Sequence, residues 1–99
     1  MTIKENGRYV IVRGDRSGVF AGSIVARSGT EVTLENFRRI WYWSGAASIS
    51  EIAQYGVKKP ENCKFTVEVS RGIILDAVEI LDVTPEAETI IKAVPIWRA

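Results

Sequence analysis

The stretch from Phe37 to Ala47 reads Phe-Arg-Arg-Ile-Trp-Tyr-Trp-Ser-Gly-Ala-Ala and places paired guanidinium groups next to three consecutive aromatic rings. Aromatic rings stack on nucleobases and guanidinium groups bind phosphate oxygens, so the stretch favours a planar, anionic ligand. The alternative is that its tryptophans are core or subunit-interface residues, since aromatic side chains dominate both settings. If residues 37–43 are extended, each face carries a cation beside an aromatic ring: Arg39, Trp41 and Trp43 on one face, and Arg38, Ile40 and Tyr42 on the other.

The residues before this stretch predict three further strands. Residues 8–13 form an apolar, β-branched run between two glycines, residues 19–26 form a second run, and residues 31–34 alternate between polar and apolar. Gly22, inside the second run, indicates a bulge, a bend or a close backbone approach. Because the connections are short, these strands and residues 37–43 are expected to form an antiparallel meander.

The residues after Ala47 predict two short helices and two more strands. Ser48 with Glu51 fits a capping box that starts a helix ending at Gly56, and Thr84 before Pro85 starts another that runs to about residue 93. Residues 65–69 and 73–83 are interpreted as strands separated by a turn at 70–72, and residues 94–97 as an edge piece. We therefore expect an α+β fold, in which an antiparallel, strongly bent β-sheet of about six strands is flanked by two short α-helices.

Length and charge limit the classes of partner. Ninety-nine residues with 46% hydrophobic content suit one domain, here residues 1–99, and are too few for two separate cores. A net charge of +1 argues against duplex nucleic acid. Residues 1–43 contain seven Lys or Arg and four Asp or Glu, a net +3, whereas residues 44–99 contain six and eight, a net −2. This asymmetry favours a small anionic ligand bound by the N-terminal half.

The inventory of reactive residues is short. Cys63 is the only cysteine and there is no histidine, so an intramolecular disulfide is excluded and the usual zinc and iron ligands are missing. We expect no metal and no cofactor. No window approaches the roughly 18 apolar residues of a membrane span, and the N-terminus lacks the apolar core of a signal peptide, which predicts a cytoplasmic protein without a membrane partner.

Catalytic candidates are weak for the same reason. Without histidine, a general base would have to be a carboxylate, Lys, Tyr, Ser or Cys63. Asp76 and Asp82 fall on the opposite face of the expected strand 73–83 from Glu79, so a solvated strand face explains these acids better than a catalytic pair. Cys63 lacks an imidazole to deprotonate it and is interpreted as a buried or half-buried thiol. We expect no enzymatic activity.

The loop Arg13-Gly-Asp-Arg-Ser-Gly18 is a second candidate site. Its glycines allow backbone amides near Ser17 to converge on an anion, although the spacing fits neither a P-loop nor a dinucleotide fingerprint. An ordinary hairpin loop with a salt bridge to Asp15 is the alternative. Because the protomer is small, a nucleotide pocket of about 300 Å³ or more is built more readily between subunits. The two segments together predict a binder of small phosphorylated molecules, whose candidate ligand-binding residues are Arg13, Arg16, Ser17, Gly18, Arg38, Arg39, Trp41 and Trp43.

Four segments resemble a group of small phage and prophage proteins, over nearly the whole chain. They are Tyr9-Val-Ile-Val-Arg13, Asp15-Arg-Ser-Gly-Val-Phe-Ala-Gly22, Arg38-Arg-Ile-Trp-Tyr-Trp-Ser-Gly-Ala46 and Val94-Pro-Ile-Trp97. Within that group, size, element order and the early strand-loop pattern resemble the first family of Thoeris anti-defence proteins. The resemblance implies a non-enzymatic sponge that sequesters a cyclic ADP-ribose isomer made by a bacterial TIR-domain protein, in the cytoplasm of the infected host. It also implies homo-oligomers, as dimers or as hexamers that hold cyclic tri-nucleotides too.

Two other functions compete with this one. In the first, the aromatic strand is a protein–protein interface of a small phage structural or accessory protein. In the second, an acidic face containing Glu68, Asp76, Glu79 and Asp82 mimics phosphates in a nuclease inhibitor or transcription accessory, which the near-neutral net charge disfavours.

Overall fold

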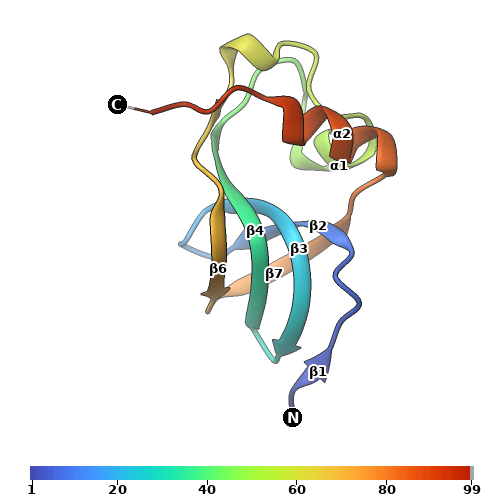
Figure 1. Cartoon of the computed structure of the whole chain (residues 1–99), viewed down its shortest axis with the longest axis vertical. Helices are drawn as coiled ribbons and strands as arrows, with labels where there is room; N and C mark the ends of the chain where they lie inside the picture. Colours follow the sequence, from blue (N-terminus) through green and yellow to red (C-terminus); the bar gives the residue numbers. More distant parts are fainter. Residues whose placement is uncertain (99) are drawn as a thin grey trace.

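The structure of the protein, a computed structural model, describes residues 1–98 as a curved β-sheet of seven strands with two α-helices at one end (Figure 1). This confirms the α+β expectation, with one strand more than the sequence indicated. A short 3₁₀ turn, Pro60–Asn62, follows the first helix. The elements are β1 (Ile3–Lys4), β2 (Tyr9–Gly14), β3 (Val19–Ser28), β4 (Glu31–Tyr42), α1 (Ile49–Tyr55), β5 (Lys64–Phe65), β6 (Val69–Ile74), β7 (Ala77–Asp82) and α2 (Pro85–Ala93).

The sheet is antiparallel throughout its ladders and is not closed. Its strand order is β5-β4-β3-β2-β7, with β1 added to β3 and β6 added to β4. Both β5 and β6 pair with β4, at different points along it: Phe65 lies opposite Ile40, and Val69 lies opposite Phe37. Although β6 and β7 follow each other in the chain, one pairs with β4 and the other with β2, so the sheet curls between them.

Two hydrophobic cores lie on the two faces of this sheet. Because side chains alternate along a strand, β2 sends Tyr9 and Ile11 to one core and Val10 and Val12 to the other, which explains why all four are buried. The outer core lies between the sheet and the helices and consists of Tyr9, Ile11, Ala21, Ile40, Ile52, Ala53, Val57, Cys63, Phe65, Ile91 and Val94. The inner core lies within the curl and consists of Val10, Val12, Phe20, Ile24, Val32, Leu34, Phe37, Ile74 and Ala77.

Both helices begin where their capping residues predict. The Ser48 hydroxyl accepts a hydrogen bond from the Glu51 amide at the start of α1, and Gly56 follows the end of that helix with a φ of 77°. At the start of α2, Thr84 accepts from the Ala87 amide. The helices pack against each other and cover the outer core.

The two strands predicted at 31–34 and 37–43 are one continuous strand, β4, which corrects the sequence interpretation. The dipeptide Glu35-Asn36 was expected to connect them. Instead Asn36 adopts a φ of 49° inside the strand, where the pairing register with β3 shifts. Asparagine tolerates this left-handed conformation, and the chain uses it for a bulge rather than a turn. Gly22 lies opposite, as the prediction of a bulge or close approach required: a Cβ there would lie 2.4 Å from Phe37 Cβ.

The boundaries predicted between residues 65 and 83 were also wrong. Residues 70–72, expected to form a turn, lie in the middle of β6, and the expected long strand 73–83 is broken at Leu75–Asp76. No glycine or proline marks that break. The piece expected at 94–97 is reduced to a single parallel bridge between Ile96 and Phe65.

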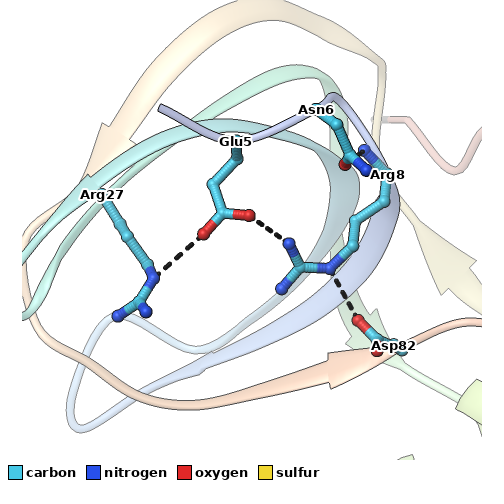
Figure 2. Close-up of polar contacts among 5 residues, drawn as sticks. All are labelled: Glu5, Asn6, Arg8, Arg27 and Asp82. Atoms are coloured by element: carbon cyan, nitrogen blue, oxygen red, sulfur yellow. Dashed lines mark hydrogen bonds and ion pairs between the residues drawn. The ribbon is translucent and has the colours of Figure 1, made fainter. Parts of the chain in front are cut away.

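An ionic network fastens the N-terminal segment to the sheet (Figure 2). Glu5 accepts hydrogen bonds from Arg27 and Arg8, and Arg8 also bonds Asp82, at the end of β7. The hydrogen bond from Arg27 is the largest cause that holds the pKa of Glu5 below its ordinary value, and the bond to Asp82 is the main cause that raises the pKa of Arg8. The network joins the segment between β1 and β2 to β3 and to the end of β7.

Candidate ligand groove

A groove of about 520 Å³ opens between the β2–β3 loop and the turn that joins β6 to β7. It lies where the inner core reaches the surface, because the buried residues Phe20 and Ile74 contribute to its lining. Its cationic side consists of Arg16 and Arg39, which are both exposed. The full lining is Arg16, Ser17, Phe20, Arg39, Ile73, Ile74, Leu75 and Asp76.

The β2–β3 loop is an amide nest, and its anion is a carboxylate of the same chain. The Asp76 carboxylate accepts hydrogen bonds from the Arg16 amide at 2.8 Å, the Ser17 amide at 3.0 Å and the Ser17 hydroxyl at 2.6 Å. These bonds, the Ser17 hydroxyl first, hold the pKa of Asp76 below its ordinary value. Gly14 makes room for the contact, since a Cβ there would lie 1.9 Å from the Ser17 oxygen. The expected convergence of amides is present, but Asp76 occupies it.

Arg39 lies across the entrance to the inner core. Its guanidinium carbon lies 4.5 Å from the centroid of the Phe20 ring, and its Nη1 donates to the Ser17 carbonyl oxygen. Within residues 1–98, neither Arg39 nor Arg16 forms a salt bridge. The groove therefore combines an apolar lining with two guanidinium groups that form no salt bridge in the described part of the chain.

The structure brings part of the predicted ligand-binding set together. Arg16, Ser17 and Arg39 line the groove, and Gly18 lies beside it, since a Cβ on Gly18 would lie 3.1 Å from Arg39 Nη1. The remaining four predicted residues lie elsewhere: Arg13, Arg38, Trp41 and Trp43.

Arg38 is the clearest correction among them. Only 6% of Arg38 is exposed, and its guanidinium donates to four backbone carbonyl oxygens, those of Phe65, Thr66, Ile91 and Pro95. Burial lowers the pKa of Arg38. Because the Ile91 carbonyl belongs to the last turn of α2, the cation also meets the negative end of the helix dipole. Arg38 therefore joins α2 to the β5 region and is withdrawn from the ligand-binding set.

The other three residues are separated from the groove. Arg13 pairs with Glu79 at 2.9 Å. Trp43 packs against the outer core. Trp41 is 63% exposed and Tyr42 is 53% exposed, so the expected alternation of faces fails where the β4–β5 register shifts.

Lys64 marks a second aromatic surface at that end of β4. Its ammonium lies 5.3 Å from the Trp97 ring and 5.9 Å from the Tyr42 ring. The arginines and tryptophans that were predicted to bind one ligand thus do not share one site. Two separate surfaces result: the groove, and the exposed aromatic surface around Lys64 with Tyr42 and Trp97.

Sequence reasoning missed the groove residues contributed by β6 and its turn, which are Ile73, Ile74, Leu75 and Asp76. Their signal was hidden in the apolar run 73–83, which reads as one strand. Phe20 was missed because it reads as an ordinary core position of β3. Only the curl of the sheet brings these residues to the β2–β3 loop.

Two features of the described residues bear on the chemistry. Among residues 1–98, no cluster of three or more His, Cys, Asp or Glu side chains could hold a metal ion. No helix within the same range has the length and apolar character needed to cross a membrane.

A family model matches residues 7–91 of the chain. The chain belongs to the family DUF6948, described as a domain of unknown function. The part of the chain that this DUF6948 model matches contains every residue that lines the groove. No curated protein and no solved structure matches the chain.

Proposed function

We propose that the protein binds a small nucleotide-like anion in the groove and releases it chemically unchanged. The observation that carries this proposal is a pair of guanidinium groups beside an apolar lining, those of Arg16 and Arg39, which form no salt bridge within residues 1–98. Guanidinium groups bind phosphate oxygens in pairs of charge-assisted hydrogen bonds. The volume of about 520 Å³ lies within the range typical of small-molecule sites.

The apolar part of the lining suits the base or ribose of a nucleotide. Ile73 and Leu75 are exposed at the groove, and Phe20 lies beneath Arg39. A flat guanidinium over an aromatic ring is itself a surface on which a base stacks. A ligand with one ring and two or more phosphate oxygens therefore fits this lining better than inorganic phosphate does.

The groove is better equipped for binding than for turnover. Asp76 is the one carboxylate in its lining, and three hydrogen bonds hold it ionised within the β2–β3 loop. A general base has to be free to take a proton near neutral pH, and a carboxylate with a lowered pKa is poorly suited to that. The role proposed for such a binder is that of a phage anti-defence sponge for a cyclic nucleotide signal, acting in the cytoplasm of the infected host.

Calorimetric titration with a cyclic ADP-ribose isomer tests the proposal directly. We expect saturable binding, weakened at least tenfold by Arg39→Gln and by Arg16→Gln, because each removes a charge-assisted bond worth about 1.5–3 kcal/mol. Arg13→Gln is the matched control: Arg13 is in the same segment but pairs with Glu79, so its loss leaves affinity unchanged. Heating the complex and analysing the released ligand by mass spectrometry is expected to return the intact molecule.

Two results would contradict this function. Recovery of a cleaved product would establish an enzyme. Absence of binding at millimolar cyclic ADP-ribose, cyclic tri-nucleotide and ADP-ribose alike would show that the groove takes no nucleotide.

A second function, that of a protein–protein interface on the aromatic strand, is favoured by the exposure of Trp41 and Tyr42. Trp41→Ala would then abolish assembly with a phage protein while leaving nucleotide affinity intact. Arg39→Gln would do the reverse if the groove is the functional site, so the two variants separate the two functions.

A further inference from the structure

The outward face of β6 is an apolar strip that nothing within residues 1–98 covers. Two even positions of β6 face inward: Ile74 is buried in the inner core, and a Cβ on Gly72 would lie 2.9 Å from the Phe37 ring. The odd positions face away from that core. The apolar ones, with exposures between 41% and 66%, are Val69 and Ile73 within β6 and Val67 and Leu75 just outside it. The remaining odd position is Arg71. Such alternation is typical of a strand face that is buried in the working protein.

The backbone of β6 also has a free edge. In the described part of the chain, β6 pairs with β4 alone, and Figure 1 shows it on the outer side of β4. Natural proteins protect such edges with charges, prolines or bulges, because unpaired amides and carbonyls are a template for another strand. β6 carries one charged residue, Arg71, and no proline. Its edge and its outward face are therefore both suited to a partner strand.

We propose that β6 pairs antiparallel with β6 of a second copy of this chain, about a two-fold axis at Arg71. In that register Val69 lies opposite Ile73 of the partner subunit, and Val67 lies opposite Leu75 of the partner subunit. Every apolar residue of the strip then lies opposite an apolar residue of the partner subunit, and the two-fold axis repeats each of these pairs. A two-fold interface has to be self-complementary, and this spacing around residue 71 meets that requirement.

The charges at the axis are also balanced. Two arginines directly opposite each other would destabilise the pairing. Here each Arg71 is bound by Glu35 of its own chain, with Nη1 2.7 Å from Oε2, because Glu35 lies opposite it on β4. Across the dimer the two arginines are the inner members of the row and the two glutamates the outer ones, so each guanidinium is neutralised by the carboxylate of its own chain, which reduces the repulsion at the axis.

The pairing also reaches the groove. Ile73 and Leu75 belong to both the strip and the groove lining, so the partner subunit's Val67 comes to the rim of the groove beside Leu75. Each groove is then bordered by both subunits. The dimer itself does not depend on the function proposed above, and its test uses no nucleotide.

Sedimentation equilibrium on the full chain, at concentrations up to millimolar, measures the association. We expect a dimer whose dissociation constant rises at least tenfold in Ile73→Lys, because a lysine at each of two symmetric positions breaks the apolar pairs. Val69→Lys, on the facing position, gives a second measurement of the same contact. Tyr55→Lys is the matched control, since Tyr55 is a comparably exposed apolar residue on α1, and it leaves the dimer unchanged. Circular dichroism checks that each variant is folded.

A disulfide between copies tests the register, in a Cys63→Ala background. Paired Cα atoms on antiparallel strands lie about 4.5–5.5 Å apart, within the range that a disulfide spans. Arg71→Cys is therefore expected to cross-link on mild oxidation. Val69→Cys is expected not to, because the two copies of residue 69 are offset by four residues, about 13 Å along the strand.

Three results would overturn the proposal. A chain that stays monomeric at millimolar concentration leaves the strip to a different protein. A dimer that Ile73→Lys and Val69→Lys do not weaken uses another surface. Cross-linking at residue 69 in place of residue 71 rules out the proposed axis.

Discussion

At the scale of single residues, two adjacent arginines have different roles, although the sequence made both of them candidates for ligand binding. Arg38 and Arg39 are neighbours on β4, yet the first is buried and the second is exposed at the groove. Strand alternation accounts for the difference, because one faces the outer core and the other faces away from it. The guanidinium of Arg38 is tolerated in the interior because four carbonyl oxygens solvate it in place of water.

Replacing Arg38 by methionine is expected to lower the free energy of unfolding by at least about 3 kcal/mol. Several buried carbonyls would lose their donor, and each unsatisfied group costs about 1–3 kcal/mol. Arg39→Met provides the comparison, with a loss of about 1 kcal/mol or less because that side chain is exposed. Urea denaturation of both variants measures the difference, and equal losses would show that Arg38 does not join α2 to β5.

Asp76 gives a prediction for pH. Its pKa is lowered in the folded protein, chiefly by the Ser17 hydroxyl, so its bonds to the loop contribute stability above the ordinary carboxyl pKa. That contribution is lost as pH falls through the lowered value. We expect Ser17→Ala to raise the pKa of Asp76 toward its ordinary value, as followed by NMR titration of the carboxyl carbon. Asp76→Asn should be less stable than the wild type at neutral pH, with a difference that narrows in acid. An unchanged titration in Ser17→Ala would contradict this account.

At the scale of elements, the sequence predicts most where the signal is local. Ser48 and Thr84 mark both helix starts because a cap acts on amides three residues away. The break at Asp76 is different. Its carboxylate is bound by amides 59 and 60 residues away, so no window of sequence around it contains the cause. Only part of the groove was predicted, for the same reason. Its arginines lie in segments that the sequence marks as unusual, whereas its β6 residues come close to them only because the sheet curls.

The bulge in β3 and β4 depends on one glycine. A Cβ on Gly22 would lie 2.4 Å from Phe37 Cβ and 2.8 Å from Phe37 Cα, and backbone at that distance can move only by opening the ladder. Gly22→Ala is therefore expected to cost about 2–3 kcal/mol or more by overpacking. Gly29→Ala measures the cost of backbone strain by itself. A Cβ on Gly29 would meet open space, but the residue has a φ of 57°, so this strain is expected to cost about 1–2 kcal/mol. Thermal unfolding of both variants measures these losses. A larger loss of stability in Gly29→Ala than in Gly22→Ala would contradict this account.

At the scale of the whole molecule, the two cores are joined by the strands they share. β2 supplies both cores from adjacent residues, so neither core can open without exposing the other side of the same strand. Ile11 in the outer core and Ile24 in the inner core are both fully buried, which makes them a matched pair. Each isoleucine-to-alanine change is expected to cost about 2–5 kcal/mol.

The distribution of that loss distinguishes one cooperative unit from two. If the shared strands couple the cores, hydrogen exchange in α2 and in β6 speeds up together in both variants, because all of these amides then exchange through the same global opening. Two independent units would behave differently: Ile24→Ala would accelerate exchange in β4 and β6 alone, while the amides of α2 kept their wild-type protection. Exchange measured in both variants at one pH and temperature decides between these outcomes. A groove formed where the inner core reaches the surface is as rigid as the whole fold only in the first case, and that rigidity would hold Arg16 and Arg39 in place for the proposed ligand.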